Sequence, residues 1–344
     1  MQTDWQAIDQ GLMLEKVLHA PQRARAHWQK GLQHPLQAKT EIRQVLICGM
    51  GGSGSTGDFL QALCTTATVP ILVNKAAEIP AWVNAHTLVI GVSYSGQTAE
   101  TLACIEQAIA QGAQLHLLSS GGRVAELAET YGISYVPLDG GLPPRAALFD
   151  LAFALLGSII DCPVFQLNQV ESEASLQWLG SLSASWTPDQ TNKPLPLSLA
   201  EQLLPFAHTL IWGRAGQSGE VALRWKNQFA ENSKRLGCNS VFPELNHNEI
   251  VPICARHHSQ SAAIYLSLES TLSAFDQISL DLITPHLGRV EVVKAQGEGR
   301  LQRLLYLIYL GDFLSVYLAF LSGTDPTPIA AITELKNRMA EIKE

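Results

Sequence analysis

The pattern of apolar and polar positions divides the chain into a helix-rich start and two α/β stretches. Residues 4–40 place apolar side chains at helical spacing, with an expected break at Pro21. From residue 41, short runs rich in valine and isoleucine alternate with longer amphipathic segments, which is typical of parallel-sheet units. The expected strands are 44–48, 71–74, 87–92, 114–118 and 134–137, and the expected helices are 57–64, 99–111 and 124–131.

A second α/β set follows a polar segment rich in turn-forming residues, 180–196, which we interpret as part of a linker. Its expected strands are 209–213, 240–242, 261–268 and 289–293, and its expected helices are 218–234, 300–321 and 328–342. We therefore predict an N-terminal helical segment (1–40), a first domain (41–165), a linker (166–200) and a second domain of similar plan (201–344) that includes the C-terminal helix.

One expected helix raises the question of a membrane span. Residues 304–321 are apolar except for Gly311, Asp312 and Ser315. This length could just cross a bilayer, but Asp312 would then lie near its middle at a cost of about 3 kcal/mol. We expect instead a buried helix in an oligomer core, and therefore a homodimer that binds no membrane.

Composition and charge narrow the class of protein. Of 344 residues, 47% are hydrophobic and 16% charged, which excludes a disordered chain. The net charge of −8 argues against a general nucleic-acid binder. The first residues show neither a basic nor an apolar leader region, and the six cysteines form no C-x-x-C pair. Both features indicate a cytoplasmic protein with reduced thiols.

Two loops at predicted strand ends carry candidate binding chemistry. Gly49-Met-Gly-Gly-Ser-Gly matches the dinucleotide pattern G-x-G-x-x-G, but the following strand ends in Asn74 rather than in an acidic residue. We therefore do not expect a nicotinamide cofactor. The second loop, Ser93-Tyr-Ser-Gly-Gln-Thr98, places three hydroxyls before a helix, which favours a phosphate monoester. The alternative is an ordinary helix cap without a ligand.

These two loops resemble the sugar-isomerase (SIS) fold, a flavodoxin-like, three-layer α/β fold with a parallel sheet. Further segments are similar to the bifunctional phosphoglucose/phosphomannose isomerases: Leu142-Pro-Pro-Arg145, Asn227-Gln-Phe-Ala-Glu-Asn232, Glu244-Leu-Asn-His-Asn-Glu249 and Ala331-Ile-Thr-Glu-Leu-Lys336. The resemblance runs from about residue 41 to the end but leaves the linker unmatched. It implies two SIS domains and an isomerase of phosphorylated hexoses.

The resemblance also implies roles for individual residues. Such an enzyme moves a proton between C1 and C2 through a cis-enediol, which requires a base, a nearby cation and groups that open the sugar ring. Glu231 would be the base, Arg145 the cation beside the enediolate, and His247 and Lys336 the ring-opening groups. The phosphate would be held by Gly52, Ser53, Ser93, Ser95 and Thr98. The family further implies a dimer partner that helps complete the site.

Each of these residues also has a purely structural interpretation. Glu231 could be a solvated helix residue, Arg145 an exposed turn residue, His247 part of a polar turn, and Lys336 a solvent-facing charge. The run Cys254-Ala-Arg-His-His258 has no second ligand pair at zinc spacing, so we expect no metal. The enediol route needs no organic cofactor either.

The sequence thus predicts a metal-independent isomerase that interconverts glucose 6-phosphate and fructose 6-phosphate, and also accepts mannose 6-phosphate. Two alternatives stay open. One is a non-catalytic sugar-phosphate sensor with the same fold, and the other is an isomerase of a different phosphosugar.

Overall fold

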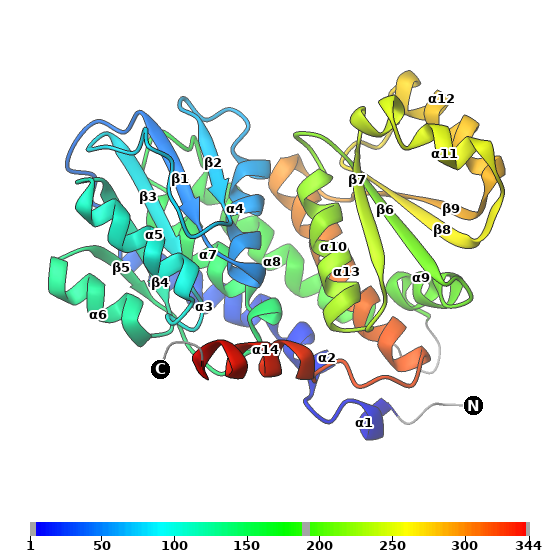
Figure 1. Ribbon diagram of the computed structural model, residues 1–344, viewed down its shortest axis with the longest axis horizontal. Coiled ribbons are helices and arrows are strands. Elements are labelled where there is room, and N and C mark those ends of the chain that lie inside the picture. Colours follow the sequence, from blue (N-terminus) through cyan, green and yellow to red (C-terminus); the bar gives the residue numbers. More distant parts are fainter. Residues whose placement is uncertain (1–4, 188–192, 342–344) are drawn as a thin grey trace.

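The computed structural model describes residues 5–187 and 193–341, which form two parallel β-sheets side by side (Figure 1). The first sheet has the order β2-β1-β3-β4-β5, and each neighbouring pair is parallel. Its strands are β1 (Gln44–Cys48), β2 (Ile71–Asn74), β3 (Thr87–Val92), β4 (Gln114–Ser119) and β5 (Ser134–Pro137). All five predicted strands are confirmed.

The second sheet repeats this plan with one strand fewer. Its order is β7-β6-β8-β9, again all parallel. The strands are β6 (His208–Arg214), β7 (Gly237–Phe242), β8 (His258–Ser267) and β9 (Leu287–Lys294). In both sheets the strand that comes first in the chain lies between the second and the third: β1 lies between β2 and β3, and β6 between β7 and β8. The predicted α/β class with two parallel sheets is confirmed.

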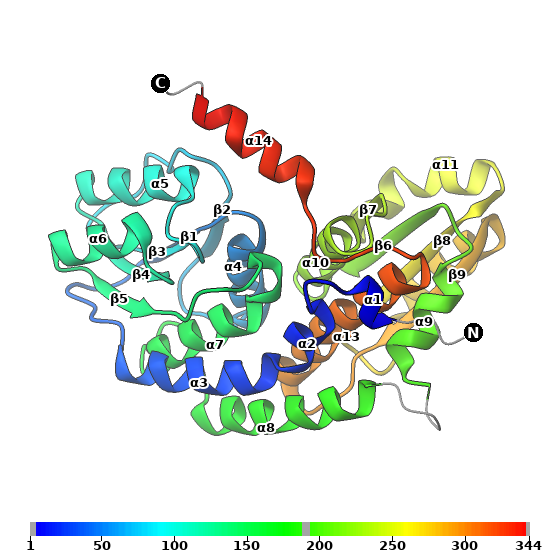
Figure 2. The same cartoon turned by 90° about the horizontal axis from the view of Figure 1, so that it is seen from below.

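Helices cover both faces of the first sheet (Figure 2). On one face lie α5 (Ala99–Ala110) and α6 (Gly122–Tyr131), and on the other α3 (Ala20–Gln33) and α7 (Leu148–Ile159). Between the two sheets stand α4 (Gly51–Leu63), α10 (Gly219–Glu231) and α13 (Gly299–Leu321), and all three are in mutual contact (Figure 1). Further elements of the second half are α9 (Leu195–Leu203), α11 (Ile250–Ala255), α12 (Ala274–Ile283) and α14 (Ala330–Glu341). Three 3₁₀ turns are η1 (Pro144–Ala146), η2 (Glu244–His247) and η3 (Thr284–His286).

The N-terminal region differs from the single broken helix that we expected over residues 4–40; residue 4 lies outside the described residues. It forms α1 (Trp5–Ile8), α2 (Met13–Leu18) and α3, and residues 35–40 are not helical. Pro21 does not break the helix. It lies in the first turn of α3, where a backbone N–H has no intrahelical partner and its loss costs nothing.

Within the predicted linker, the segment 180–196 that we expected to form turns is helical at both ends. Residues Gln169–Trp186 form α8, and α9 begins at Leu195; residues 188–192 lie outside the described part of the chain. Serine and glycine suggested turns, but Leu176, Leu179 and Leu182 recur at helical spacing and are buried. Tertiary burial outweighs the weak helix propensity of the small polar residues.

The apolar helix α13 is long and apolar enough to cross a membrane, but 94% of its most apolar window is buried inside the chain. It packs against α8, α9 and α10. The expected burial is therefore confirmed, whereas its expected cause is wrong, because the chain's own helices cover α13. The helix provides no argument for a homodimer.

A single apolar core runs through both halves of the molecule. It includes Phe59, Leu118 and Phe153 from the first half and Phe229, Leu266 and Phe313 from the second. A buried polar cluster lies within it. Arg224 on α10 donates two hydrogen bonds of 2.8 Å to the Asp312 carboxylate on α13 and one of 3.1 Å to the carbonyl of Arg145. The two sheets are thus held in one arrangement.

At the carboxyl edge of the second sheet, a different ion pair joins β6 to α12. Arg214, the last residue of β6, pairs with the buried carboxylate of Asp276 in the first turn of α12. Ser273 caps α12 by accepting the Asp276 N–H, and the Tyr265 hydroxyl donates to the same carboxylate over 3.0 Å.

We expect Arg224→Met to lower the free energy of unfolding by about 3 to 5 kcal/mol, because the buried Asp312 carboxylate would lose its cation. Burial raises the pKa of Asp312, and Arg224 opposes that rise. Urea denaturation measures the loss. The control Arg123→Met removes the exposed pair with Glu126 and should cost less than about 1 kcal/mol. Equal losses in the two variants would contradict the assigned role of Arg224.

Candidate active site at the junction of the two sheets

The loop that follows β3 has the form expected for anion binding. Ser93 is buried and donates from Oγ to Oγ1 of Thr98 over 3.0 Å, and Thr98 directly precedes α5. Ser95 is exposed. Gly96 has φ +68°, and a Cβ on it would lie 1.8 Å from the Gly121 carbonyl oxygen. Only glycine fits at this position, so the loop is built around it.

The glycine segment after β1 is joined to this loop. α4 begins at Gly51 rather than at 57 as expected, so Gly52 and Ser53 lie in its first turn. Ser53 Oγ accepts the backbone N–H of Tyr94 over 3.0 Å. The N-termini of α4 and α5 and their hydroxyl groups therefore meet at the carboxyl edge of the first sheet, where parallel α/β proteins bind anionic ligands.

A close backbone approach places Arg145 beside this edge. A Cβ on Gly52 would lie 2.5 Å from the carbonyl oxygen of Pro144 and 3.0 Å from the backbone nitrogen of Arg145. The turn η1 that carries Arg145 therefore packs directly on the first turn of α4. No side chain larger than that of glycine fits between them.

Arg145 is almost fully buried, with 2% of its surface exposed. Its Nε donates to Oδ1 of Asn232 over 2.6 Å, and its Nη2 donates to the carbonyls of Pro326 and Thr327 over 2.8 Å each. Its Nη1 lies 3.4 Å from Oε2 of Glu231. Burial lowers the pKa of Arg145, while the Glu231 carboxylate opposes that change. The sequence alternative of an exposed turn residue is therefore wrong.

Glu231 is the last residue of α10, and 27% of its side chain is exposed. The expected helix continued to 234, but Lys234 has a left-handed φ of +54° and ends it early. The carboxylate thus faces a fixed cation on one side and remains open to solvent on the other. A group in this position can exchange a proton with a bound molecule.

The other two residues with an implied catalytic role are not brought to this place. His247 is exposed at the end of η2, and Lys336 is exposed on α14, which extends away from both sheets (Figure 2). Within residues 5–187 and 193–341, neither makes a hydrogen bond or ion pair with Arg145 or Glu231.

Two further residues at this junction were not singled out from the sequence. Asn232 is 1% exposed and links Arg145 to Ser315, because its Nδ2 donates to Ser315 Oγ over 2.9 Å. Lys234 donates from Nζ to carbonyls at the end of α10. Asn232 ends the segment Asn227–Asn232 that resembles the isomerases. Its partners are 80 or more positions away in the sequence, so no spacing rule marks it.

Two further features concern the strand end that a dinucleotide site would use and the side chains that could bind a metal. Asn74 at the end of β2 donates to the carbonyls of Ala76 and Glu78, so its amide serves the turn that follows. No group of three or more His, Cys, Asp or Glu side chains in the described part of the chain could hold a metal ion.

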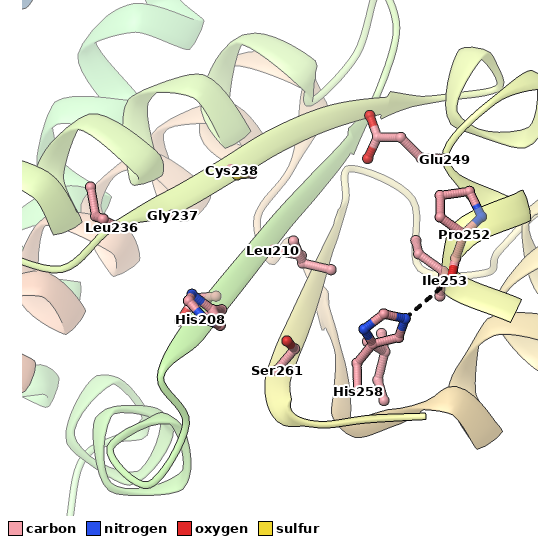
Figure 3. Close-up of a pocket in the computed structure, with 12 residues that line it drawn as sticks. His208, Leu210, Leu236, Gly237, Cys238, Glu249, Pro252, Ile253, His258 and Ser261 are labelled. Carbon is pink, nitrogen blue, oxygen red and sulfur yellow. Dashed lines mark hydrogen bonds between the residues drawn. The ribbon is translucent and has the colours of Figure 1, made fainter. Parts of the chain in front are cut away.

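A separate cavity of about 490 Å³ lies at the opposite edge of the second sheet, near the amino ends of β6, β7 and β8 (Figure 3). Its walls are mostly apolar, with Leu210, Leu236 and Ile253 among them. His258 on its rim is bonded to the carbonyl of Pro252, and Glu249 accepts a hydrogen bond from Ser240. None of the residues assigned from the resemblance lines this cavity.

Comparison with known proteins identifies the class of protein to which this α/β fold belongs. Residues 194–339 match the model of the bacterial phospho-glucose isomerase C-terminal SIS domain. The fold is similar to the C-terminal domain of glucosamine-fructose-6-phosphate aminotransferase from Francisella tularensis, with a TM-score of 0.71 and 16% identity over 92% of this chain and 98% of that chain. Residues 194–339 therefore form a SIS domain.

Two curated relatives define the family more closely, and both are named bifunctional phosphoglucose/phosphomannose isomerase. The one from Caldicellulosiruptor bescii is 35% identical over 96% of this chain and its own full length. The one from Thermoplasma acidophilum is 31% identical over 86% of this chain and 89% of its own. The chain belongs to the family of bifunctional phosphoglucose/phosphomannose isomerases.

We expect Gly52→Ala to lower the free energy of unfolding by about 1 to 3 kcal/mol, because the added Cβ forces α4 away from Pro144. Chemical denaturation measures the change. Gly180→Ala, in the middle of α8 with open space around its Cβ position, is the matched control. It should stabilise the protein by about 0.5 to 1 kcal/mol, and a stabilising Gly52→Ala would contradict the close approach.

Proposed function

We propose that this chain is an aldose–ketose isomerase that interconverts glucose 6-phosphate and fructose 6-phosphate, and that it also accepts mannose 6-phosphate. The observation that carries the proposal is the Arg145–Glu231 pair, 3.4 Å apart, beside a hydroxyl-rich loop in a chain of this family. A carboxylate base and a fixed cation are what an enediol route requires.

In the proposed reaction the 6-phosphate binds at the carboxyl edge of the first sheet. The hydroxyls of Ser53, Ser93, Ser95 and Thr98 hold it, and Gly52 gives access to the backbone. The adjacent N-termini of α4 and α5 favour a dianion there. This places the sugar carbons toward the junction between the sheets, where Arg145 and Glu231 lie.

Glu231 then removes the proton from C2 of the open-chain aldose and returns it to C1. A second proton moves from the C2 hydroxyl to O1, so that the ketose forms without any net gain or loss. The positive charge of Arg145 stabilises the enediolate between these steps. A planar enediol does not retain the configuration at C2, which is why the mannose epimer can share the route.

Ring opening is assigned to His247 and Lys336, and this requires a second copy of the chain. Both residues are exposed, and within residues 5–187 and 193–341 neither makes a hydrogen bond or ion pair with Glu231. The helix α14 also presents Ile332, Leu335 and Met339 to solvent at helical spacing. A helix of this length is marginal without packing, so we infer a homodimer in which these surfaces are covered. We place the enzyme in the cytoplasm, which the six free cysteines support.

The test of the function is a coupled assay of the purified protein on fructose 6-phosphate, with and without a metal chelator, repeated with mannose 6-phosphate. We expect glucose 6-phosphate to form at the same rate in both conditions. Binding without turnover of any of these sugars would support the sensor alternative, and turnover of other phosphosugars alone would support the second alternative.

For the base, we expect Glu231→Gln to lower turnover about 10²-fold or more while phosphosugar binding is retained, because an amide cannot accept the C2 proton. Steady-state kinetics and a binding isotherm measure the two effects. Glu129→Gln, which changes an exposed carboxylate on α6, is the control. Turnover near that of the wild type in Glu231→Gln would refute the assignment.

For the dimer, we expect complementation between two inactive variants, Glu231→Gln and His247→Asn. If each site takes Glu231 from one copy and His247 from the other, a mixed dimer retains one intact site. After refolding of an equal mixture, about a quarter of wild-type turnover should return. No recovery would show that both residues act within one copy, and a monomeric mass by light scattering would exclude the dimer.

A further inference from the structure

A short hinge, Pro326-Thr327, leads from the body of the protein into α14 and is held from one side by two cations. The carbonyl oxygen of Pro326 accepts a hydrogen bond from Nη2 of Arg145 over 2.8 Å and another from Nζ of Lys234 over 3.0 Å. A buried cation and a lysine thus share one acceptor. We call this arrangement of Arg145, Lys234 and the Pro326 carbonyl the carbonyl clasp.

The backbone of Lys234 is in a conformation that L side chains rarely adopt. Its φ of +54° places it in the left-handed region just after α10. The N–H groups of Ser233 and Arg235 both donate to the carbonyl of Phe229, which closes the end of the helix around this residue. Glycine is the usual residue at such a helix end, because it has no Cβ to strain the backbone. The presence of lysine at this position therefore points to a role for its side chain.

The ammonium group of Lys234 reaches across the end of α10. Besides the bond to Pro326, it donates to the carbonyl of Glu231 over 2.6 Å and lies 3.4 Å from that of Asn232. One side chain therefore ties the backbone of the proposed base to the hinge. Holding the ammonium group here has a cost. Burial and the charge of Arg145 both lower the pKa of Lys234, while Asp325 and Glu231 oppose that change.

The opposite side of the hinge is also fixed. A Cβ on Gly11, between α1 and α2, would lie 2.2 Å from Oγ1 of Thr327. The N-terminal segment thus packs directly on the hinge, and the N–H of Thr327 donates to Asp325 over 2.9 Å. Loss of the clasp would release the hinge on the side that faces Glu231.

We propose that Lys234 is a positioning residue of the isomerase site: through the carbonyl clasp it fixes the hinge before α14 relative to Glu231 and Arg145. This inference rests on the proposed function. It assigns no contact between Lys234 and the sugar. Its role is to keep the base, the cation and the helix that carries Lys336 in a single arrangement.

The experiment compares Lys234→Gly, Lys234→Arg and the control Gln166→Gly. Gln166 is also in the left-handed region, with φ +51°, but lies on the loop before α8. Both glycine variants relieve the backbone, and only Lys234→Gly removes the lysine bond of the clasp, leaving that of Arg145. We expect Lys234→Gly to melt close to the wild-type temperature, with kcat lowered about 10-fold and KM changed less than about twofold. Lys234→Arg should restore most of kcat, and Gln166→Gly should resemble the wild type.

Amide hydrogen exchange of the same proteins reports on the hinge independently of catalysis. We expect faster exchange at Thr327 and Ile329 in Lys234→Gly but not in Lys234→Arg. Unchanged exchange in Lys234→Gly would overturn the clasp, and unchanged kcat would overturn its role in positioning. If the wild type turns over no phosphosugar, the proposed function fails, whereas the exchange measurement still decides whether the clasp holds the hinge.

Discussion

A buried guanidinium needs a hydrogen-bond acceptor for each of its donors, and at Arg145 this requirement organises the whole junction. Its acceptors come from two distant parts of the chain, the end of α10 and the hinge before α14. Because removal of any one of them would leave a buried N–H group of Arg145 without an acceptor, separating these segments costs free energy. The charge therefore fixes the geometry around Glu231.

The packing around Arg145 reinforces this constraint. Its carbonyl accepts a hydrogen bond from Arg224, so the residue is held by its backbone as well as by its side chain. Arg224 in turn is anchored to Asp312 inside the continuous core. On the other side, Gly52 brings the first turn of α4 against η1. The hydroxyl-rich loop and the Arg145–Glu231 pair are thus connected through rigid contacts, as the proposed function requires if one small sugar is to be aligned at both ends.

Much of the fold could be predicted from the sequence because local patterns determine it. Continuous apolar runs such as Val45–Cys48 mark buried parallel strands, and those strands were located within a few residues. The failures have a common origin in long-range burial. Leu179 makes a helix of a segment whose serines suggested turns, and the chain's own helices cover Leu304–Leu321. No local pattern reports what packs on a face.

The site was predictable to a similar extent. The hydroxyl loop and the glycine turn are contiguous in sequence, so their juxtaposition at one sheet edge follows from parallel topology. The proximity of Arg145 to Glu231 came only from the family resemblance, since 86 positions separate them. Asn232 and Lys234 were missed because their partners, Ser315 and Pro326, are equally remote. Their roles depend on backbone carbonyls and on a left-handed φ, neither of which is visible in a sequence.

The ion pair between Arg214 and Asp276 gives corresponding edges of the two sheets different chemistry. In the first half, the edge where the first and third strands end is lined with neutral hydroxyls. At the corresponding edge of the second half, an arginine is already neutralised by a carboxylate of its own chain. An incoming anion would have to displace that carboxylate from a buried position. The carboxylate of Asp276 thus already occupies the place beside Arg214 that an anion would need, so the two sheet edges differ in how readily they could accept one.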